Sequence, residues 1–562
     1  MLPQQSPISE DFCPKWLNPL LIGFLALIAV LQVLMVFRFE VNWDEFFLLD
    51  WVYKWNSGEL DLVLQTIYFR AFTWLPATSN NEVSQIVAAR LVMLACLGAS
   101  SAFIYSICRK FTTKTAALLS LILFLTMTYV FRNATSFRTD MLVTVILMGA
   151  LWCLITPVLT WKRVLISGVS LGLAGMVTIK AIFYTPIIAT TLLAHWGYSN
   201  WRFSIFLKSA TTGAVALLTF ISLYILHGFG LEPSTSSAFI TNSVSSSLFE
   251  AGMLPQKKAF SIALTSNPLV FIILLLGMCR SLLNISEPKK RWANLVALSC
   301  IIPFLTIIFY RHAHPYFYTF MLAPATLLVA IGLNVSWIKR KIVVTSLLIL
   351  ALFASTVSIT LRSLSQNLDT QKQVLDTIHK LFPNPTPYID RCAMIASYPK
   401  FGLFMSHWVM GDYYKTNKGI MKDILISNQP KFILANIGGL KLDKITTDTD
   451  RRLLKADEEL LQDNYIPHWG PVYVAGKTVQ INGGKPTDFQ IYIAGHYGVE
   501  AMYPLEINGS TYQSGDIINL KQGVQNLSSR KTQTLTLRWN KLEYPNTSPP
   551  QKKLFHGFYA ID

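Results

Sequence analysis

Two neighbouring carboxylates, Asp44 and Glu45, stand in the aromatic stretch NWDEFFLLDWVYKW, directly after a long apolar segment. A carboxylate close to lipid costs free energy unless it has a partner or a function. The functional interpretation is catalysis, because a carboxylate at the edge of a dry region can act as a general base towards an attacking hydroxyl. The residues alone leave a second interpretation open, in which the pair only neutralises a lysine or an arginine.

A second polar cluster is FRNATSFRTD (131–140), in which Arg138 and Asp140 stand between two apolar runs. These two side chains can form the wall of a binding site and orient a substrate or the acidic pair. The alternative is a mutually paired cap at the end of a membrane helix. Lys180, in GMVTIKAIFYTP, is a further cation at a break between apolar runs. It either extends to the membrane surface or joins the same site.

The third cluster lies in YRHAHPYFYTFMLAP (310–324), between two later apolar runs. Its side chains with binding chemistry are Arg311, His314, Tyr316 and Tyr318. Arginine binds phosphate with a planar fork, and histidine and tyrosine donate further hydrogen bonds. The cluster therefore suits a phosphate at the membrane surface, although a basic and aromatic membrane anchor has the same composition. His312 and His314 lack an evident third metal ligand, so we predict no metal site and no cofactor, and leave a divalent cation open.

The elements that must position these clusters are membrane helices. The 562-residue chain is 52% hydrophobic and only 14% charged, which is too apolar for an ordinary soluble protein. A membrane-spanning helix needs about 20 apolar residues. About eleven runs approach this length, and we predict a helix at each: 18–37, 86–107, 115–131, 141–157, 164–179, 181–196, 207–227, 264–283, 293–310, 316–336 and 342–361.

The distribution of charge predicts the orientation of these helices. The formal net charge is +17, and the short loops after even-numbered runs hold clusters of Lys and Arg, such as 109–114 and 289–291. Positive loops stay on the cytoplasmic side, so we predict a cytoplasmic N-terminus (1–17) and no role in nucleic-acid binding. Loop 39–85, loop 228–263 and the chain after 362 then lie outside. Loop 228–263 reads as a mobile lid or as a plain polar loop.

The chain after 362 loses its long apolar runs and reads as an outer domain. We predict an α/β region over 363–464 and a β-rich, sandwich-like region over 465–562, following a transmembrane domain over 18–362. Cys392 is the one cysteine in this outer part, which rules out an internal disulfide there and favours a bacterial inner membrane with the site facing the periplasm.

The three clusters fall on the outer side, so they can converge on one cavity that holds a base and a phosphate clamp. In this respect the chain resembles the GT-C superfamily of polyprenyl-phosphate-sugar-dependent glycosyltransferases. It looks closest to the branch of the protein O-mannosyltransferases and the lipid A aminoarabinose transferase. The resemblance covers roughly 20–360, and its motifs are NWDE (42–45), FRTDMLVTVILMGAL (137–151), GLAGMVTIK (172–180) and RHAHPYFYTFMLAP (311–324).

The resemblance implies that Asp44 is the base, that Glu45 is its neighbour, and that Arg138 and Asp140 line the site. It also implies that Arg311 and the nearby tyrosines face the donor phosphate. Thr139, where proline is usual, and the lack of a glycine after Lys180 depart from the family's pattern.

The implied function is the transfer of a sugar from a polyprenyl-phosphate donor to an acceptor hydroxyl on a lipid, glycan or protein, with inversion at the sugar carbon. A transporter or flippase for an anionic lipid-linked glycan is the alternative, and a scaffold whose outer domain binds glycan is a third possibility. The sequence does not identify the sugar, the polyprenol or the acceptor.

Overall fold

The structure is a computed structural model of the chain. It describes residues 16–231, 252–333, 342–364, 368–442, 453–551 and 553–556. Most of the 228–263 loop and nearly all of the predicted cytoplasmic segment 1–17 lie outside these ranges, so neither interpretation of that loop is addressed.

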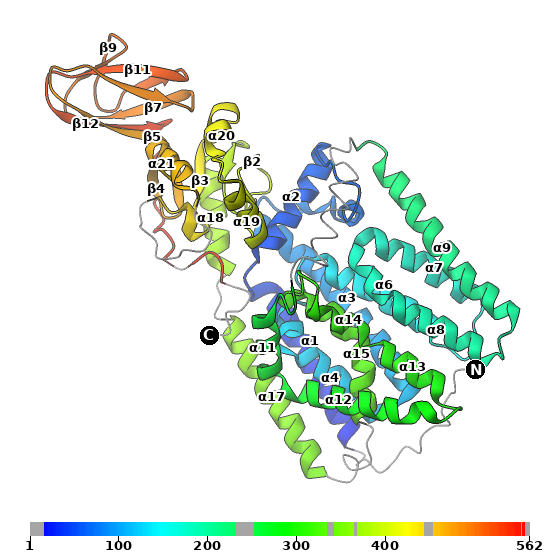
Figure 1. Ribbon diagram of the computed structural model, residues 1–562. Coiled ribbons are helices and arrows are strands. Elements are labelled where there is room, and N and C mark those ends of the chain that lie inside the picture. The colour runs from blue at the N-terminus through cyan, green and yellow to red at the C-terminus, as the bar shows by residue number, and fades with distance from the viewer. Residues whose placement is uncertain are drawn as a thin grey trace.

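The N-terminal two-thirds of the chain is a bundle of helices (Figure 1). Helices form here because a chain in lipid must satisfy its backbone polar groups within the segment itself. The helices of the bundle are α1 (Leu17–Arg38), α3 (Glu82–Phe111), α4 (Lys114–Thr126), α5 (Thr128–Asn133), α6 (Thr139–Leu154), α7 (Trp161–Val177), α8 (Thr185–Tyr198), α9 (Phe203–Gly228), α11 (Lys257–Ser266), α12 (Pro268–Leu283), α13 (Arg291–Ser299), α14 (Ile302–Leu305), α15 (Tyr318–Leu333) and α17 (Ile342–Leu364).

Helices occupy all eleven predicted runs, and the predicted polytopic fold with a C-terminal sheet-rich part is confirmed. Among the described residues, seven helical segments are long and apolar enough to cross a membrane. The other runs form shorter helices, such as α4 with 13 residues and α8 with 14. Four of the eleven predicted runs thus form helices shorter than a full span. One reason is a break at Met127, whose extended ψ of 128° separates α4 from α5 within a single apolar run.

Helices α12 and α15 cross at two glycines that allow their backbones to touch. A Cβ atom on Gly277 would lie 1.9 Å from the Leu328 carbonyl oxygen, and one on Gly332 would lie 2.2 Å from that of Ile273. Small residues at a crossing permit this close approach of membrane helices. Helix α15 is buried along its whole length. The crossing therefore helps to fix this helix, which begins within the third polar cluster.

We expect Gly277→Ala to destabilise the bundle by about 1–3 kcal/mol, because the added methyl group forces two backbones apart. The apparent melting temperature in detergent, followed by tryptophan fluorescence, measures the loss. Gly213→Ala on α9 is the matched control, since a Cβ there meets nothing within 4 Å. Equal melting temperatures for the two variants would contradict the close crossing.

The acidic pair lies in the first turn of α2 (Trp43–Ser57), the helix of the first outer loop. Asn42 caps this helix, and the side chains of Asn42 and Glu45 form a reciprocal capping box with each other's backbone N–H groups. Gly58, at φ 77°, ends the helix in the left-handed conformation. The local sequence N-W-D-E therefore fixes where Asp44 stands, and the 3₁₀ turns η1 (Ile67–Phe72) and η2 (Leu75–Thr78) complete the loop.

The chain after α17 forms a mixed domain of helices and sheets. Its helices are α18 (Leu368–Leu381), α19 (His407–Thr416), α20 (Met421–Ser427) and α21 (Lys455–Asn464). Its strands are β1 (Tyr388–Ile389), β2 (Lys400–Phe401), β3 (Phe432–Leu434), β4 (Tyr465–Trp469), β5 (Val472–Ile481), β6 (Thr487–Ile491), β7 (Gly495–Glu500), β8 (Leu505–Ile507), β9 (Ser510–Tyr512), β10 (Ile517–Leu520), β11 (Gly523–Ser528) and β12 (Gln533–Trp539).

One sheet runs through both parts of this domain. Its order is β10-β7-β12-β5-β3-β1-β2, with β4 also paired to β5, and a second sheet has the order β6-β11-β8-β9. Strands β1, β2 and β3 are parallel to one another, whereas β5 is antiparallel to β3 and to β12. Strand β5 thus links an α/β part to a β-rich part, which extends away from the helix bundle (Figure 1).

Side chains of α18 attach the outer domain to the first outer loop and to α3. The Gln371 amide bonds both the N–H and the carbonyl of Val41, each at 2.8 Å. His379 contacts the Glu82 carboxylate at 3.0 Å. The guanidinium of Arg391 lies 3.9 Å from the centre of the Trp43 ring, directly beside the acidic pair. The outer domain therefore contacts the stretch of chain that carries Asp44.

Candidate functional site

Four charged side chains from three segments of the bundle form one ion-pair network. Arg138 Nη1 lies 2.5 Å from Asp44 Oδ2, and Arg138 Nε lies 3.3 Å from Asp140 Oδ2. Lys180 Nζ lies 2.8 Å from Asp140 Oδ1. The structure thus brings the first two predicted clusters and Lys180 together, although 94 residues separate Asp44 from Arg138.

Helix ends position these side chains. Arg138 is the N-cap residue of α6, and Asp140 lies in the first turn of that helix, where a carboxylate interacts favourably with the helix dipole. Lys180 is the second residue of the 3₁₀ turn η3 (Ile179–Tyr184), and the side chain of the N-cap Thr178 accepts the Lys180 N–H. Each charge therefore stands in the first turn of a helix or directly before it.

The third cluster contacts this network through Tyr316, in the 3₁₀ turn η6 (Pro315–Phe317). The Arg138 guanidinium lies 3.4 Å from the centre of the Tyr316 ring, and Lys180 Nζ lies 5.6 Å from the same centre. Burial opposes the charge of Arg138, but Asp44, Tyr316 and Asp140 outweigh it and hold the pKa of the guanidinium well above its ordinary value. Arg138 is therefore a permanent cation fixed between two carboxylates and an aromatic face.

Arg311, His312 and His314 extend the cluster next to Tyr316. Arg311 Nε lies 3.4 Å from His312 Nε2, and the His314 and Tyr316 rings are 5.6 Å apart. Burial, with the neighbouring cations, lowers the pKa of His312 to about 3. Burial also lowers the pKa of His314 to about 4, although Asp44 partly opposes this. Both rings are neutral at neutral pH, so His314 offers a hydrogen bond to a phosphate, as the sequence interpretation expected of a histidine.

We expect the two buried histidines to make the protein less stable in acid. Their folded-state pKa values lie below the ordinary value of about 6.5, so the unfolded chain binds more protons between pH 4 and 6.5. Their contribution to stability is complete above about pH 6.5 and is lost as the pH falls towards 4. The melting temperature should drop less between pH 7.5 and 5 in His314→Gln than in the unmodified protein, and an equal drop would contradict this assignment.

Glu45 faces away from this network despite being adjacent to Asp44. Its carboxylate lies 2.5 and 2.8 Å from the Arg90 guanidinium nitrogens and accepts the Phe137 N–H at 2.7 Å. It is completely buried. The predicted catalytic role for Glu45 is therefore not supported by the geometry, because no atom of this carboxylate is open to a substrate. Glu45 instead ties α2 to α3 and to the segment that leads into α6.

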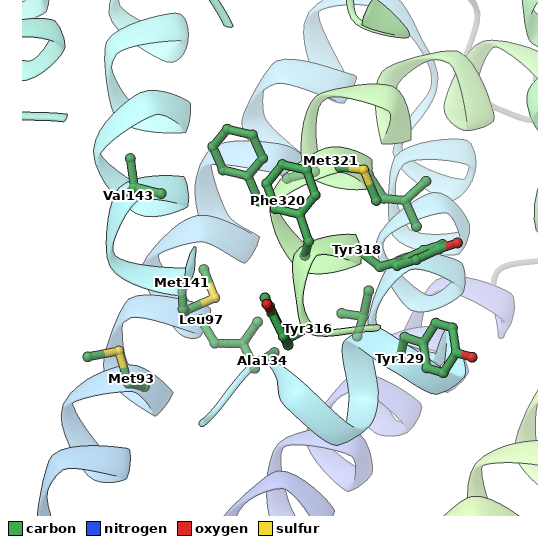
Figure 2. Close-up of a cluster of buried hydrophobic side chains, with 14 of the residues drawn as sticks. Met93, Leu97, Tyr129, Ala134, Met141, Val143, Tyr316, Tyr318, Phe320 and Met321 are labelled. Atoms are coloured by element: carbon green, nitrogen blue, oxygen red, sulfur yellow. The ribbon is translucent and has the colours of Figure 1, made fainter. Parts of the chain in front are cut away.

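Tyr318 also lies apart from the charged network. Its ring packs against Tyr129 with the ring centres 5.1 Å apart, within the cluster of buried side chains drawn in Figure 2. Tyr316 belongs to the same apolar cluster but reaches the charged residues through its ring face. The predicted donor-binding role thus has geometric support for Tyr316 but not for Tyr318.

The interpretation of the sequence missed two arginines. Arg90 stands alone in the apolar run 86–107, and a lone charge in such a run marks a specific partner, which proved to be Glu45. Arg391 belongs to the outer domain, and nothing in the sequence near it indicates a contact with Trp43.

The arrangement suits proton transfer beside a bound anion. Asp44 Oδ2 is fixed by Arg138, whereas Oδ1 accepts no hydrogen bond from any described residue, and the side chain is 20% exposed. The available oxygen can accept a proton from a hydroxyl while Lys180 and Arg311 face an anionic group. Within the described ranges, no three His, Cys, Asp or Glu side chains gather in a group that could hold a metal ion.

Comparisons with known proteins find one family match within the bundle. Residues 73–225, which include Arg138, Asp140 and Lys180, match the model of a family described as dolichyl-phosphate-mannose-protein mannosyltransferase. A search of curated proteins finds no match.

Two solved structures resemble the chain over nearly its whole length. The oligosaccharyltransferase of Archaeoglobus fulgidus in the apo form is 10% identical, with a TM-score of 0.56 over 95% of this chain and 98% of that one. The same organism's AglB, in complex with an inhibitory peptide and a dolichol-phosphate, is 10% identical, with a TM-score of 0.54 over 95% of this chain and 97% of that one. ArnT from Cupriavidus metallidurans bound to undecaprenyl phosphate is 12% identical, with a TM-score of 0.46 over 68% of this chain and 75% of that one.

At 10% identity the two archaeal structures show a shared fold only. The family match covers the segment that carries three of the four residues of the ion-pair network. The chain therefore shares the fold of the two archaeal structures, and the resemblance to the protein O-mannosyltransferase branch that its motifs predicted is confirmed.

Proposed function

We propose that the chain is a membrane glycosyltransferase that moves a sugar from a polyprenyl-phosphate carrier to an acceptor hydroxyl. The observation that carries this proposal is the Asp44 carboxylate, which has one fixed and one available oxygen and belongs to the same network as Lys180. The printed names of the related structures, two of which hold a polyprenyl phosphate, favour a lipid-linked donor for this chain as well.

The reaction is a single displacement. The acceptor oxygen attacks the anomeric carbon of the donor sugar, and its proton passes to Asp44 Oδ1. The bond between that carbon and the phosphate oxygen breaks, and its electron pair leaves with the polyprenyl phosphate. One displacement inverts the configuration of the anomeric carbon.

The cations beside Asp44 stabilise the leaving group. Lys180 and Arg311 supply positive charge to the departing phosphate, while the neutral His314 ring and Tyr316 line the same wall. Arg138 and Asp140 act as positioning residues, since each is held in ion pairs that orient Asp44 and Lys180.

The catalytic part of the proposal spans 18–362, with 1–17 in the cytoplasm. The regions 363–464 and 465–562 lie outside, and in a bacterium this side is the periplasm. The positive loops support this orientation, and the described contacts of α18 place the outer domain on the side of the acidic pair.

The purified protein in proteoliposomes tests the donor class. We expect release of undecaprenyl phosphate from undecaprenyl-phosphate hexoses or pentoses, supplied with a panel of lipid, saccharide and peptide acceptors, and no use of nucleotide sugars. Turnover of a nucleotide sugar would contradict the proposal. Movement of the intact donor between the two leaflets without release would favour the transporter alternative.

A further inference from the structure

A small cavity lies beside Arg138, and Lys180 is not part of its lining. It is formed where the end of α1, the segment between α5 and α6, and the C-terminal tail meet. Its lining residues are Phe39, Glu40, Asn42, Arg132, Asn133, Ser136, Arg138 and His556. These residues come from parts of the chain that lie far apart in sequence, so the cavity exists only in the folded protein.

The cavity shares Arg138 with the proposed active site but shares none of the phosphate-facing residues. Arg138 is 2.5 Å from Asp44, and the lining residue Asn42 accepts the Asp44 backbone N–H at 3.0 Å. Lys180 and Tyr316 are not part of the lining. A molecule in the cavity would therefore lie beside Arg138 and Asn42, the two residues that contact Asp44, and could bring a hydroxyl to the Asp44 carboxylate without displacing Lys180 or Tyr316.

The lining is suited to a hydroxyl-rich molecule. Within the described residues the Ser136 hydroxyl makes no hydrogen bond to protein, although Ser136 is buried. The Asn133 side-chain NH₂ group donates to the Tyr129 carbonyl. The side-chain oxygen of Asn133 can then accept a hydrogen bond from a ligand. The Phe39 ring, with the Arg132 guanidinium 5.3 Å from its centre, adds a flat face for C–H groups. Planar polar groups beside one aromatic ring bind a sugar better than they bind a lipid chain.

We propose that this cavity is the acceptor subsite and that it takes a saccharide, an inference that rests on the glycosyltransferase function proposed above. The C-terminal tail closes it on one side. The His556 ring nitrogen Nδ1 lies 2.5 Å from Glu40 Oε2, and the His556 N–H donates to Glu40 Oε1 at 2.9 Å. The cavity volume of about 20 Å³ holds about one water molecule, so a sugar ring enters only when the contact between His556 and Glu40 opens.

The test uses undecaprenyl-phosphate mannose as donor and measures the release of undecaprenyl phosphate into water, with methyl α-D-mannopyranoside, and with a short threonine-containing peptide. We expect the mannoside to accelerate release in a saturable way. Ser136→Ala should raise the KM for the mannoside about fivefold, as one lost hydrogen bond implies, and leave the KM for the donor unchanged. Ser100→Ala, which removes a buried hydroxyl without a partner elsewhere in α3, is the matched control.

His556→Ala provides a second variant at the chain end, where folding is less at risk. We expect it to raise the rate of release into water at least twofold, because the cavity then opens to solvent. Acceleration by the peptide but not by the mannoside, or an unchanged mannoside KM in Ser136→Ala, would overturn the saccharide subsite while the glycosyltransferase function stands. No release into water or into either acceptor would instead count against the proposed function itself.

Discussion

Asp44→Asn should slow the release of polyprenyl phosphate by about a thousandfold, within the range of about 10²–10⁴ for the loss of a general base. An amide cannot take the proton of the acceptor hydroxyl, so the attacking oxygen loses its activation. The fold should survive, since Arg138 keeps its contact with Asp140 and the side chain of residue 44 keeps its shape. Donor binding should be unchanged, because Lys180 and Arg311 are untouched.

The measurement is single-turnover release of undecaprenyl phosphate with saturating donor, together with donor binding by equilibrium titration. Asp61→Asn makes the same chemical change at an exposed carboxylate of the first outer loop and serves as the control. A rate equal to that of the control would show that Asp44 is structural. Loss of donor binding together with activity would place Asp44 on the donor rather than on the acceptor hydroxyl.

The motif positions could be predicted from the sequence because each stands at the end of an apolar run. Arg138 and Lys180 had to lie near the membrane surface, and the positive loops put them on the same side as Asp44. The structure adds the pairing itself, with Asp140 between Arg138 and Lys180. Which cation meets which carboxylate depends on how the helices pack, and helix packing has no signature in single segments.

The sequence does not predict the direction in which each side chain points. Asp44 and Glu45 are neighbours, but successive residues of a helix point about 100° apart, so only one of them reaches the network. The same holds for Tyr316 and Tyr318, which a change from a 3₁₀ turn to the helix α15 separates. The contact between His556 and Glu40 joins residues 516 positions apart, and no local pattern predicts it.

Glu45→Gln should lower the free energy of unfolding by about 3–5 kcal/mol, the cost of removing one partner from a buried ion pair. Both carboxylate oxygens of Glu45 are occupied, by Arg90, by the Phe137 N–H and by the Asn42 N–H. Glutamine has one oxygen and one NH₂ group, so a donor would face another donor in a completely buried position. Arg90 would keep the carbonyls of Phe39 and Glu40 and one amide oxygen, but it would lose its carboxylate counter-ion.

Titration with SDS in mixed micelles measures this loss, and Asp44→Asn is its matched control. The two variants make the same change at adjacent positions, one completely buried and one 20% exposed. Arg90→Gln should cost a similar amount, and the double variant should cost less than the sum, because the two side chains are in direct contact. Glu45→Gln should therefore act mainly on stability and Asp44→Asn mainly on the rate. An equally stable Glu45→Gln with a thousandfold slower reaction would assign the chemistry to Glu45 instead.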